Sequence, residues 1–148
     1  MLRVRCQAHA TLDAKGRLTL PMPLRKAVAG QSAQALVFTF CKGALWGWTP
    51  DDFEVTVEAP LVDADPFDDE VMDFVHALLA PAQEVPVDGH GRVRIPLPLR
   101  ELAGLEREVV INCVLNRIEV WDRARWDERF KASMERVRHR SGMPRRAP

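Results

Sequence analysis

One stretch of this chain is written twice, and this duplication limits the possible folds more than any other feature. Residues 12–25 read LDAKGRLTLPMPLR and residues 87–100 read VDGHGRVRIPLPLR, an offset of 87 − 12 = 75. Half of the aligned positions are identical, which predicts two copies of one supersecondary unit. The identical positions of the first copy are Asp13, Gly16, Arg17, Pro21, Pro23, Leu24 and Arg25.

The same offset aligns residues further along the chain. Trp46 falls on Trp121 and Asp52 on Asp127, with apolar stretches at 35–40 and 109–115 between them. Each unit is therefore expected to span roughly 45 to 50 residues.

Each unit is predicted to begin with a strand, at 8–13 and at 83–88, and then to turn sharply. Asp at the first turn position and Gly at the fourth are typical of a type I turn closed by a glycine with positive φ. Outgoing strands are expected at 17–21 and 92–96, because apolar and polar residues alternate there.

A short helix and a second hairpin are predicted next in each unit. Pro23 and Pro98 mark the first turns of the helices, and Gly30 and Gly104 lie near their ends. The hairpins are predicted to turn at Lys42-Gly43 and at Asn116-Arg117.

Two amphipathic helices are predicted outside the repeated units. The first is expected to open at Asp65-Pro66, with Phe67, Val71, Phe74, Val75 and Leu78 on one face. The second is expected to be capped by Asp122, and its apolar residues recur every three or four positions at Trp126, Phe130, Met134 and Val137.

Four short strands are too few for one unit to bury both faces of a sheet, so the copies must pack on each other. We expect a mainly β protein with short helices (α+β), a pseudo-twofold body of intermixed strands plus a central and a C-terminal amphipathic helix. The expected division is repeat 1 at 7–54, an acidic helical linker at 55–81, repeat 2 at 82–125, and a C-terminal helix with a basic tail at 126–148.

The formal net charge of zero conceals strong segregation. Residues 1–30 carry six basic and one acidic side chain (+5), and residues 31–90 carry one and twelve (−11). Residues 91–122 carry five of each, and residues 123–148 carry nine basic and three acidic (+6). Such blocks are consistent with solvated surface or with a charged partner.

Turn geometry explains the repeated Asp and Gly, but it does not explain Arg17 and Arg92. Each arginine could pair with the aspartate four residues before it and pin the loop. Alternatively, the turn presents a guanidinium to phosphates or to the guanine edge in a major groove, which also admits a two-stranded ribbon. Lys15, His90 and Arg94 add nearby cationic groups.

Other classes of function find little support in the residues. The motifs of serine hydrolases, HExxH metalloproteases and nucleotide-binding loops are absent, and the four histidines show no metal-ligand spacing. We therefore expect no enzyme activity, metal or cofactor. No apolar stretch approaches the length of a membrane span or signal peptide, so a cytoplasmic protein without a membrane partner is expected. Cys6, Cys41 and Cys113 are expected to be reduced packing residues.

The paired DxxxR loops, the Pro-x-Pro-Leu-Arg helix starts and the Trp-Asp helix start resemble the MraZ family. That family consists of two fused SpoVT-AbrB domains and regulates transcription at the bacterial division and cell-wall gene cluster. The resemblance implies that Asp13, Lys15, Arg17, Asp88 and Arg92 contact double-stranded DNA, with Arg17 and Arg92 carrying most of the contact. His90 and Arg94, beside these loops, are expected to join the DNA-binding site. It also implies a ring-shaped homo-oligomer bound to short direct repeats in a promoter, in the nucleoid.

The chain also departs from that family. The central helix commonly carries paired arginines there, whereas residues 66–84 here are acidic and contain no arginine. His90 at the place of Lys15 predicts that the first loop binds DNA more strongly than the second. The alternatives to a DNA-binding regulator are an AbrB-like antitoxin, which neutralises a protein partner, and a protein-interaction scaffold without specific DNA binding.

Overall fold

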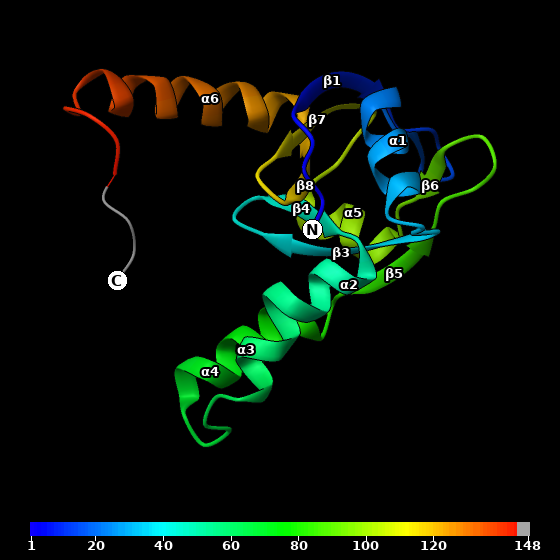
Figure 1. Ribbon diagram of the computed structural model, residues 1–148. Helices are drawn as coiled ribbons and strands as arrows, with labels where there is room; N and C mark the ends of the chain where they lie inside the picture. The colour runs from blue at the N-terminus through cyan, green and yellow to red at the C-terminus, as the bar shows by residue number, and fades with distance from the viewer. Residues whose placement is uncertain (145–148) are drawn as a thin grey trace.

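The computed structural model describes residues 1–144, a β-rich body from which two helical features project (Figure 1). Within these residues no helix is long and apolar enough to cross a membrane. The predicted basic tail falls partly on residues 145–148, which lie outside the described residues.

Both repeats have the predicted four strands and one short helix. Repeat 1 contains β1 (Cys6–Thr11), β2 (Arg17–Thr19), α1 (Met22–Gly30), β3 (Ala35–Cys41) and β4 (Ala44–Trp48). Repeat 2 contains β5 (Gln83–Pro86), β6 (Arg92–Arg94), α5 (Leu97–Ala103), β7 (Glu108–Val114) and β8 (Arg117–Asp122). Gly104 ends α5 in the left-handed conformation, at φ 60°, as expected of a helix C-terminus.

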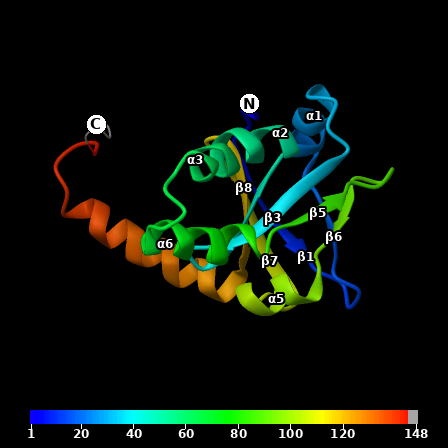
Figure 2. The same ribbon diagram turned by 90° about the horizontal axis from the view of Figure 1, so that it is seen from below.

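The strands of the two repeats are intermixed, as predicted. The main sheet has the order β1-β7-β8-β4-β3-β5, so the first strand of each repeat pairs with the third strand of the other. A separate two-stranded ribbon joins β2 to β6. All of these pairs are antiparallel, and the mainly β, α+β class is confirmed. Figure 2 shows the crossing strands from below.

The pseudo-twofold register differs from the predicted one beyond the first helix. In the hairpins, Val37 pairs with Trp48 and Val110 with Trp121, an offset of 121 − 48 = 73. Trp121 therefore corresponds to the buried Trp48, and the alignments of Trp46 with Trp121 and of Asp52 with Asp127 were wrong. Helix α1 has 9 residues and α5 has 7, whereas equally long connections lead from each helix to the next strand, so the longer helix accounts for the shift of two residues. For the same reason the second hairpin turns at Leu115 and Asn116, not at Asn116-Arg117.

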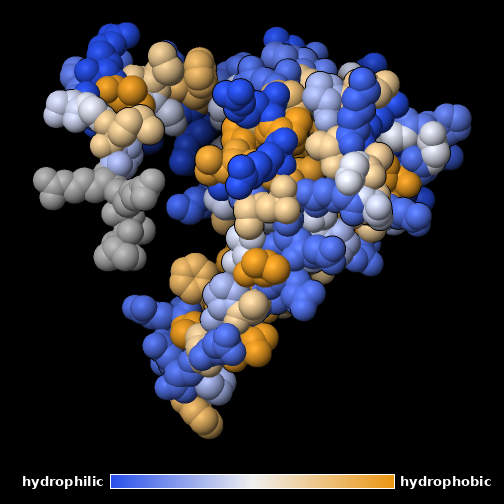
Figure 3. Space-filling model, in the orientation of Figure 1, coloured by the Kyte–Doolittle hydropathy of each residue, from blue (hydrophilic) through white to orange (hydrophobic). Residues whose placement is uncertain are grey.

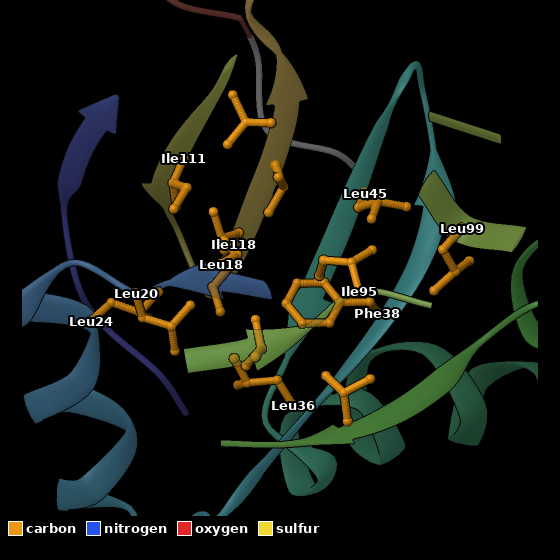
Figure 4. Packing of buried hydrophobic residues seen from close by; sticks show 14 of the residues in the cluster. Leu18, Leu20, Leu24, Leu36, Phe38, Leu45, Ile95, Leu99, Ile111 and Ile118 are labelled. Atoms are coloured by element: carbon orange, nitrogen blue, oxygen red, sulfur yellow. The ribbon is translucent and has the colours of Figure 1, made fainter. Parts of the chain in front are cut away.

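Equivalent side chains from the two repeats fill one core between the sheet, the ribbon and the short helices (Figure 4). Leu18 and Val93 face each other across the ribbon and are at most 1% exposed. Buried pairs with the same relation are Leu20 with Ile95, Leu24 with Leu99, Phe38 with Ile111 and Leu45 with Ile118. The apolar positions recur in both repeats because each repeat fills half of a shared core.

The central linker is a helical arm, residues 50–80, with two helices where one was predicted. The first consists of α2 (Pro50–Phe53), η1 (Glu54–Glu58) and α3 (Ala59–Val62), and the second of α4 (Asp69–Phe74) and η2 (Val75–Leu79). The second begins at Asp69 after the capping residue Asp68, not at Asp65-Pro66. The first helix was overlooked although the sequence carried a signal for it: a threonine followed by a proline, Thr49-Pro50, is typical of a helix start. In the structure Thr49 caps the helix and accepts a hydrogen bond from the Asp52 N–H.

Each arm helix contains a π-helical segment, η1 or η2, close before a proline. Ala59 donates its N–H to the Glu54 carbonyl and Ala80 donates to Val75, five residues back, ahead of Pro60 and Pro81. A proline lacks the N–H that an α-helix needs, and a local change of helical register is a common response. The buried Thr39 hydroxyl donates to the Leu78 carbonyl at 2.7 Å and so ties the arm to β3.

The C-terminal helix α6 (Arg123–Arg138) leaves the body beside β7 and β8 and has no buried residue. Asp122 precedes it as predicted, but its side chain makes no cap hydrogen bond to α6 and accepts one from the Glu106 N–H instead. The Trp126 ring packs on Trp121 with centroids 5.7 Å apart, which anchors the first turns of the helix.

The three cysteines are free thiols, as expected, and two of them face each other. Cys6 on β1 pairs in register with Cys113 on β7, and their sulfur atoms are 2.8 Å apart. Burial raises the pKa of the Cys113 thiol above its usual value, so this side chain is a protonated packing group at neutral pH.

Candidate nucleic-acid interface

The two Asp-x-x-Gly-Arg loops flank the β2–β6 ribbon, because each ribbon strand leaves one loop. Ribbon pairing sets Arg17 opposite Arg94 and Thr19 opposite Arg92, with Leu18 and Val93 between them. Side chains alternate across a strand, so Leu18 and Val93 enter the core while the polar residues occupy the outer face. The ribbon therefore presents three arginines and one threonine on one surface.

The first loop is held by its aspartate through both carboxylate oxygens. Asp13 Oδ1 accepts the Lys15 N–H at 2.9 Å and the Arg17 N–H at 2.8 Å, while Oδ2 accepts Nε of Arg17 at 2.7 Å. Gly16 donates its N–H to the Asp13 carbonyl and has φ 82°. The predicted turn with a left-handed glycine is thus confirmed.

The second loop repeats this network at Asp88. Its Oδ1 accepts the N–H groups of His90 and Arg92 at 2.8 and 2.9 Å, and Oδ2 accepts Nε of Arg92 at 3.0 Å. Gly91 has φ 72° and donates its N–H to the Asp88 carbonyl. His90 is exposed at the loop tip, in the position that Lys15 occupies in the first loop.

Hydrogen bonds from the arginine N–H groups hold the pKa of both carboxyls below the usual value of 3.8. For each, the largest cause is the backbone N–H of Arg17 or Arg92, and the guanidinium also contributes. Both aspartates are therefore ionised at neutral pH and serve as acceptors.

The arginine–aspartate pairs expected from the sequence as one alternative are present, at 2.7 and 3.0 Å. The two arginine side chains remain 43% and 36% exposed, so solvent screens the pairs and they contribute little to stability. In each pair the hydrogen bond to the carboxylate is made by Nε. The pair therefore limits the motion of a guanidinium that solvent, or a ligand, still reaches.

A second pair of arginines, Arg25 and Arg100, connects each loop to the other repeat. Nε of Arg25 donates to the Leu20 carbonyl at 2.8 Å, and Nε of Arg100 donates to the Ile95 carbonyl at 3.0 Å. A Cβ built on Gly16 would lie 2.9 Å from Nε of Arg100, and one on Gly91 would collide with the Arg25 side chain. Each loop glycine thus leaves room for the arginine of the partner repeat.

These two arginines have a positioning role that the sequence prediction missed. Both were among the repeated identities, which was the available signal, but sequence spacing does not reveal a contact made across the pseudo-twofold axis. The crossing is completed by the Leu20 N–H bonding to the Gly91 carbonyl and the Ile95 N–H bonding to the Gly16 carbonyl.

Arg94 breaks the symmetry of the surface. It is exposed and donates its Nε to the Lys15 carbonyl at 3.1 Å, so repeat 2 supplies a cation to the first loop. The equivalent residue of repeat 1 is Thr19, which supplies no charge to the second loop. Among the predicted residues, Lys15, Arg17 and Arg94 thus gather at one loop, and His90 and Arg92 at the other.

No group of three or more His, Cys, Asp or Glu side chains within residues 1–144 is arranged to hold a metal ion. The chemistry that the geometry supports is recognition of anions: exposed, oriented guanidinium groups with their carboxylate partners already satisfied.

Comparison with known proteins identifies the family. The model of a family described as "MraZ protein, putative antitoxin-like" matches residues 7–67 and 78–141. The chain belongs to the MraZ family. A protein named Transcriptional regulator MraZ from a Nocardioides species is 39% identical over 140 residues, which cover 88% of this chain and 93% of that protein.

Two further MraZ relatives with the same printed name come from other bacteria. The one from Acetivibrio thermocellus is 37% identical over 120 residues, covering 79% of each chain. The one from Maridesulfovibrio salexigens is 30% identical over 137 residues, covering 92% of this chain and 91% of the relative. The two segments of the MraZ family match contain one arginine loop each.

Proposed function

We propose that this chain is a sequence-specific DNA-binding transcriptional regulator, and that Arg17 and Arg92 carry most of the DNA contact. The observation that carries the proposal is the outer face of the β2–β6 ribbon, where two guanidinium groups are oriented by Asp13 and Asp88 yet remain exposed. A ribbon of two strands fits a major groove, and arginine suits both phosphates and the guanine edge. The names of the MraZ relatives support the regulatory role.

The proposed site includes the neighbouring side chains. Lys15 and Arg94 add phosphate contacts at the first loop, and His90 adds a hydrogen-bonding group at the second. Asp13 and Asp88 act through the loop shape. Phosphate contacts position a protein on DNA and base contacts give specificity, so both classes are needed.

The finer proposal concerns the target and the assembly. The chain represses the bacterial division and cell-wall gene cluster by binding short direct repeats upstream of its own operon, in the cytoplasm at the nucleoid. Copies of the chain form a ring, so several loop pairs engage successive repeats and each further contact is effectively intramolecular. The functional units are the two repeats, 7–54 and 82–125, with the linker at 55–81 and the C-terminal region at 126–148 completing the assembly.

The decisive test replaces both arginines, Arg17→Ala with Arg92→Ala, and measures binding to the DNA upstream of the gene. Each good bidentate contact to a base is worth about 1 to 3 kcal/mol, so affinity should fall by about one to four orders of magnitude in the double variant. The oligomer mass and thermal midpoint should stay near wild type. Arg5→Ala is the matched control, since Arg5 is exposed at the opposite end of β1. Unchanged DNA affinity in the double variant would refute the proposal.

Salt dependence separates this function from a scaffold that does not bind DNA. Affinity should fall steeply between about 50 and 200 mM salt, with a slope that decreases by about one unit for each phosphate contact removed. An affinity that is weak and independent of salt would favour the scaffold.

An antitoxin is the second candidate, because the matching family is described as antitoxin-like. It predicts that the chain purified from its own host brings down a stoichiometric protein with toxic activity. A lysate that returns DNA and further copies of this chain, but no such partner, favours the regulator.

A further inference from the structure

The apolar stripe of α6 has no partner in its own chain. Phe130, Met134 and Val137 are 50%, 54% and 60% exposed, and they continue outward from the half-buried Trp126. At 1.5 Å per residue the stripe from 126 to 137 is about 16 Å long. Single exposed apolar residues are ordinary, but a continuous stripe on a projecting helix indicates an interaction surface.

The helical arm offers a groove of complementary character. A cavity of about 380 Å³ lies between the β3–β4 hairpin and both arm helices, and it is open and largely apolar. Its lining includes Trp46, Trp48, Val57, Leu61, Phe74 and Leu78. The arm helices beyond α2 contain no buried residue, so the arm lacks a core of its own. Figure 3 shows apolar side chains exposed along the projecting arm.

The charges of the two surfaces are opposite. Residues 51–80 contain ten acidic side chains and no lysine or arginine, whereas α6 contains six basic and three acidic side chains. Within residues 1–144, the only ion pair made by an arm carboxylate is that of Asp52 with the N-terminal amine, at 3.7 Å. The other arm carboxylates repel one another unless cations come from elsewhere.

The arm and the helix do not meet within one chain. Packing of Trp126 on Trp121 directs α6 away from the body, and the arm leaves the body in another direction (Figure 1). Among the described residues, the body strands that α6 contacts most are β7 and β8. The stripe on α6 and the groove of the arm therefore cannot contact each other within one chain. Both remain available to a second copy.

We propose that α6 of one copy docks into the groove of the acidic arm of the next copy. The apolar stripe covers the Trp46–Phe74 groove, and the basic residues beside it, Arg129 and Arg136, face the arm carboxylates. This contact joins two different surfaces, so it is heterologous and propagates head to tail until a ring closes. The inference specifies the self-association that the proposed function invokes, and it requires no DNA contact.

The first test measures mass in solution without DNA. The double variant Phe130→Ser with Met134→Ser changes two exposed side chains, so the fold should persist, as checked by circular dichroism. The wild-type chain should form an oligomer, and the variant should be a monomer of 16.7 kDa. Leu115→Ser is the control, because Leu115 is 75% exposed on a turn outside both surfaces and its removal should leave the oligomer intact. An oligomer that survives in the double variant overturns the proposal.

A mixing experiment tests the direction of the contact. The variant Asp73→Lys with Phe74→Ser damages the arm and keeps α6, so it should also be a monomer alone. Mixed with the α6 variant, it can form one intact junction and no more, which predicts a heterodimer of about 2 × 16.7 kDa. A dimer formed by the arm variant alone would indicate contact between two α6 helices and would overturn the proposal, as would a mixture that stays monomeric.

The two proposals fail separately. If the Arg17 and Arg92 variants lose DNA binding while their oligomer mass is unchanged, the result tests DNA binding by the ribbon and not the α6 contact. If the α6 variant is a monomer that still binds a single DNA repeat weakly through its intact ribbon, the result tests the assembly and not DNA binding.

Discussion

The two arginine loops have the same hydrogen bonds and different surroundings. In each, one aspartate accepts two backbone N–H groups and one guanidinium N–H, and one glycine adopts a positive φ. The first loop also receives Arg94 from the other repeat, whereas the second faces the neutral Thr19. Duplication has preserved the bonds that shape the loop, and the charges around that shape have diverged.

Replacing the loop glycines should have the largest effect, a loss of folding stability that differs between the two loops. In Gly16→Ala the new Cβ would lie 2.7 Å from the Ile95 carbonyl oxygen, a rigid backbone atom, whereas in Gly91→Ala it meets the Arg25 side chain, which can move. Left-handed strain costs about 1 to 3 kcal/mol in both, and the first variant should lose more. Denaturant unfolding measures the difference. Gly89→Ala, in open space, is the control, and equal losses in both variants would refute the explanation.

The single arginine variants should rank the loops by DNA affinity. Arg17→Ala removes a guanidinium from the loop with three cations, where Arg17 cooperates with Lys15 and Arg94. Each variant should cost about 1 to 3 kcal/mol of binding free energy, with the larger loss for Arg17→Ala. Fluorescence anisotropy on one operator fragment would measure both. A larger loss for Arg92→Ala would reverse the proposed ranking.

Exchanging Thr19 and Arg94 should reverse the ranking of the two loops by DNA affinity, and the change in affinity should be smaller. The double variant Thr19→Arg with Arg94→Thr moves one cation from the first loop to the second and conserves the net charge. The salt slope of DNA binding should stay unchanged overall, while Arg92→Ala in this background should now cost more than Arg17→Ala. An unaltered order would mean that Arg94 does not take part in binding.

The smallest effect is the pH dependence of stability, which should be equal for the two loops. The pKa of Asp13 and of Asp88 is lowered in the folded chain, so their stabilisation is present above the usual pKa of 3.8 and is lost as pH falls through the folded value. Thermal midpoints measured between about pH 2 and 5 should drop in the wild type and drop less in Asp13→Asn and Asp88→Asn. A wild-type profile shared by both variants would show that other groups control the acid transition.

A good part of the fold followed from local patterns. The Asp-x-x-Gly-Arg turns, the proline starts of the short helices and the Lys42-Gly43 turn depend on backbone preferences within a few residues, and the structure confirms each. The helix spanning 50–62 carried a local signal too, at Thr49 and Pro50, but the proline inside it obscured the helical pattern. The pairing of each loop arginine with its aspartate could also be predicted from the sequence, because the two partners are four residues apart.

Other features depended on distance in space. Sequence identity alone could not show that the alignment changes from an offset of 75 to one of 73, because only strand pairing reveals which residues are opposite each other. The same reason concealed the roles of Arg25, Arg100 and Arg94, whose partners belong to the other repeat.

The sequence by itself determined that two similar turns would each hold an arginine against an aspartate, because those bonds close within five residues. The tertiary structure decided what those turns face. It placed β2 beside β6, so that arginines from both repeats share one surface, and it separated the acidic arm from the basic helix α6. The physical reason is that a hydrophobic core shared by two incomplete units fixes the relative position of segments far apart in the chain, and short-range preferences carry no information about that position.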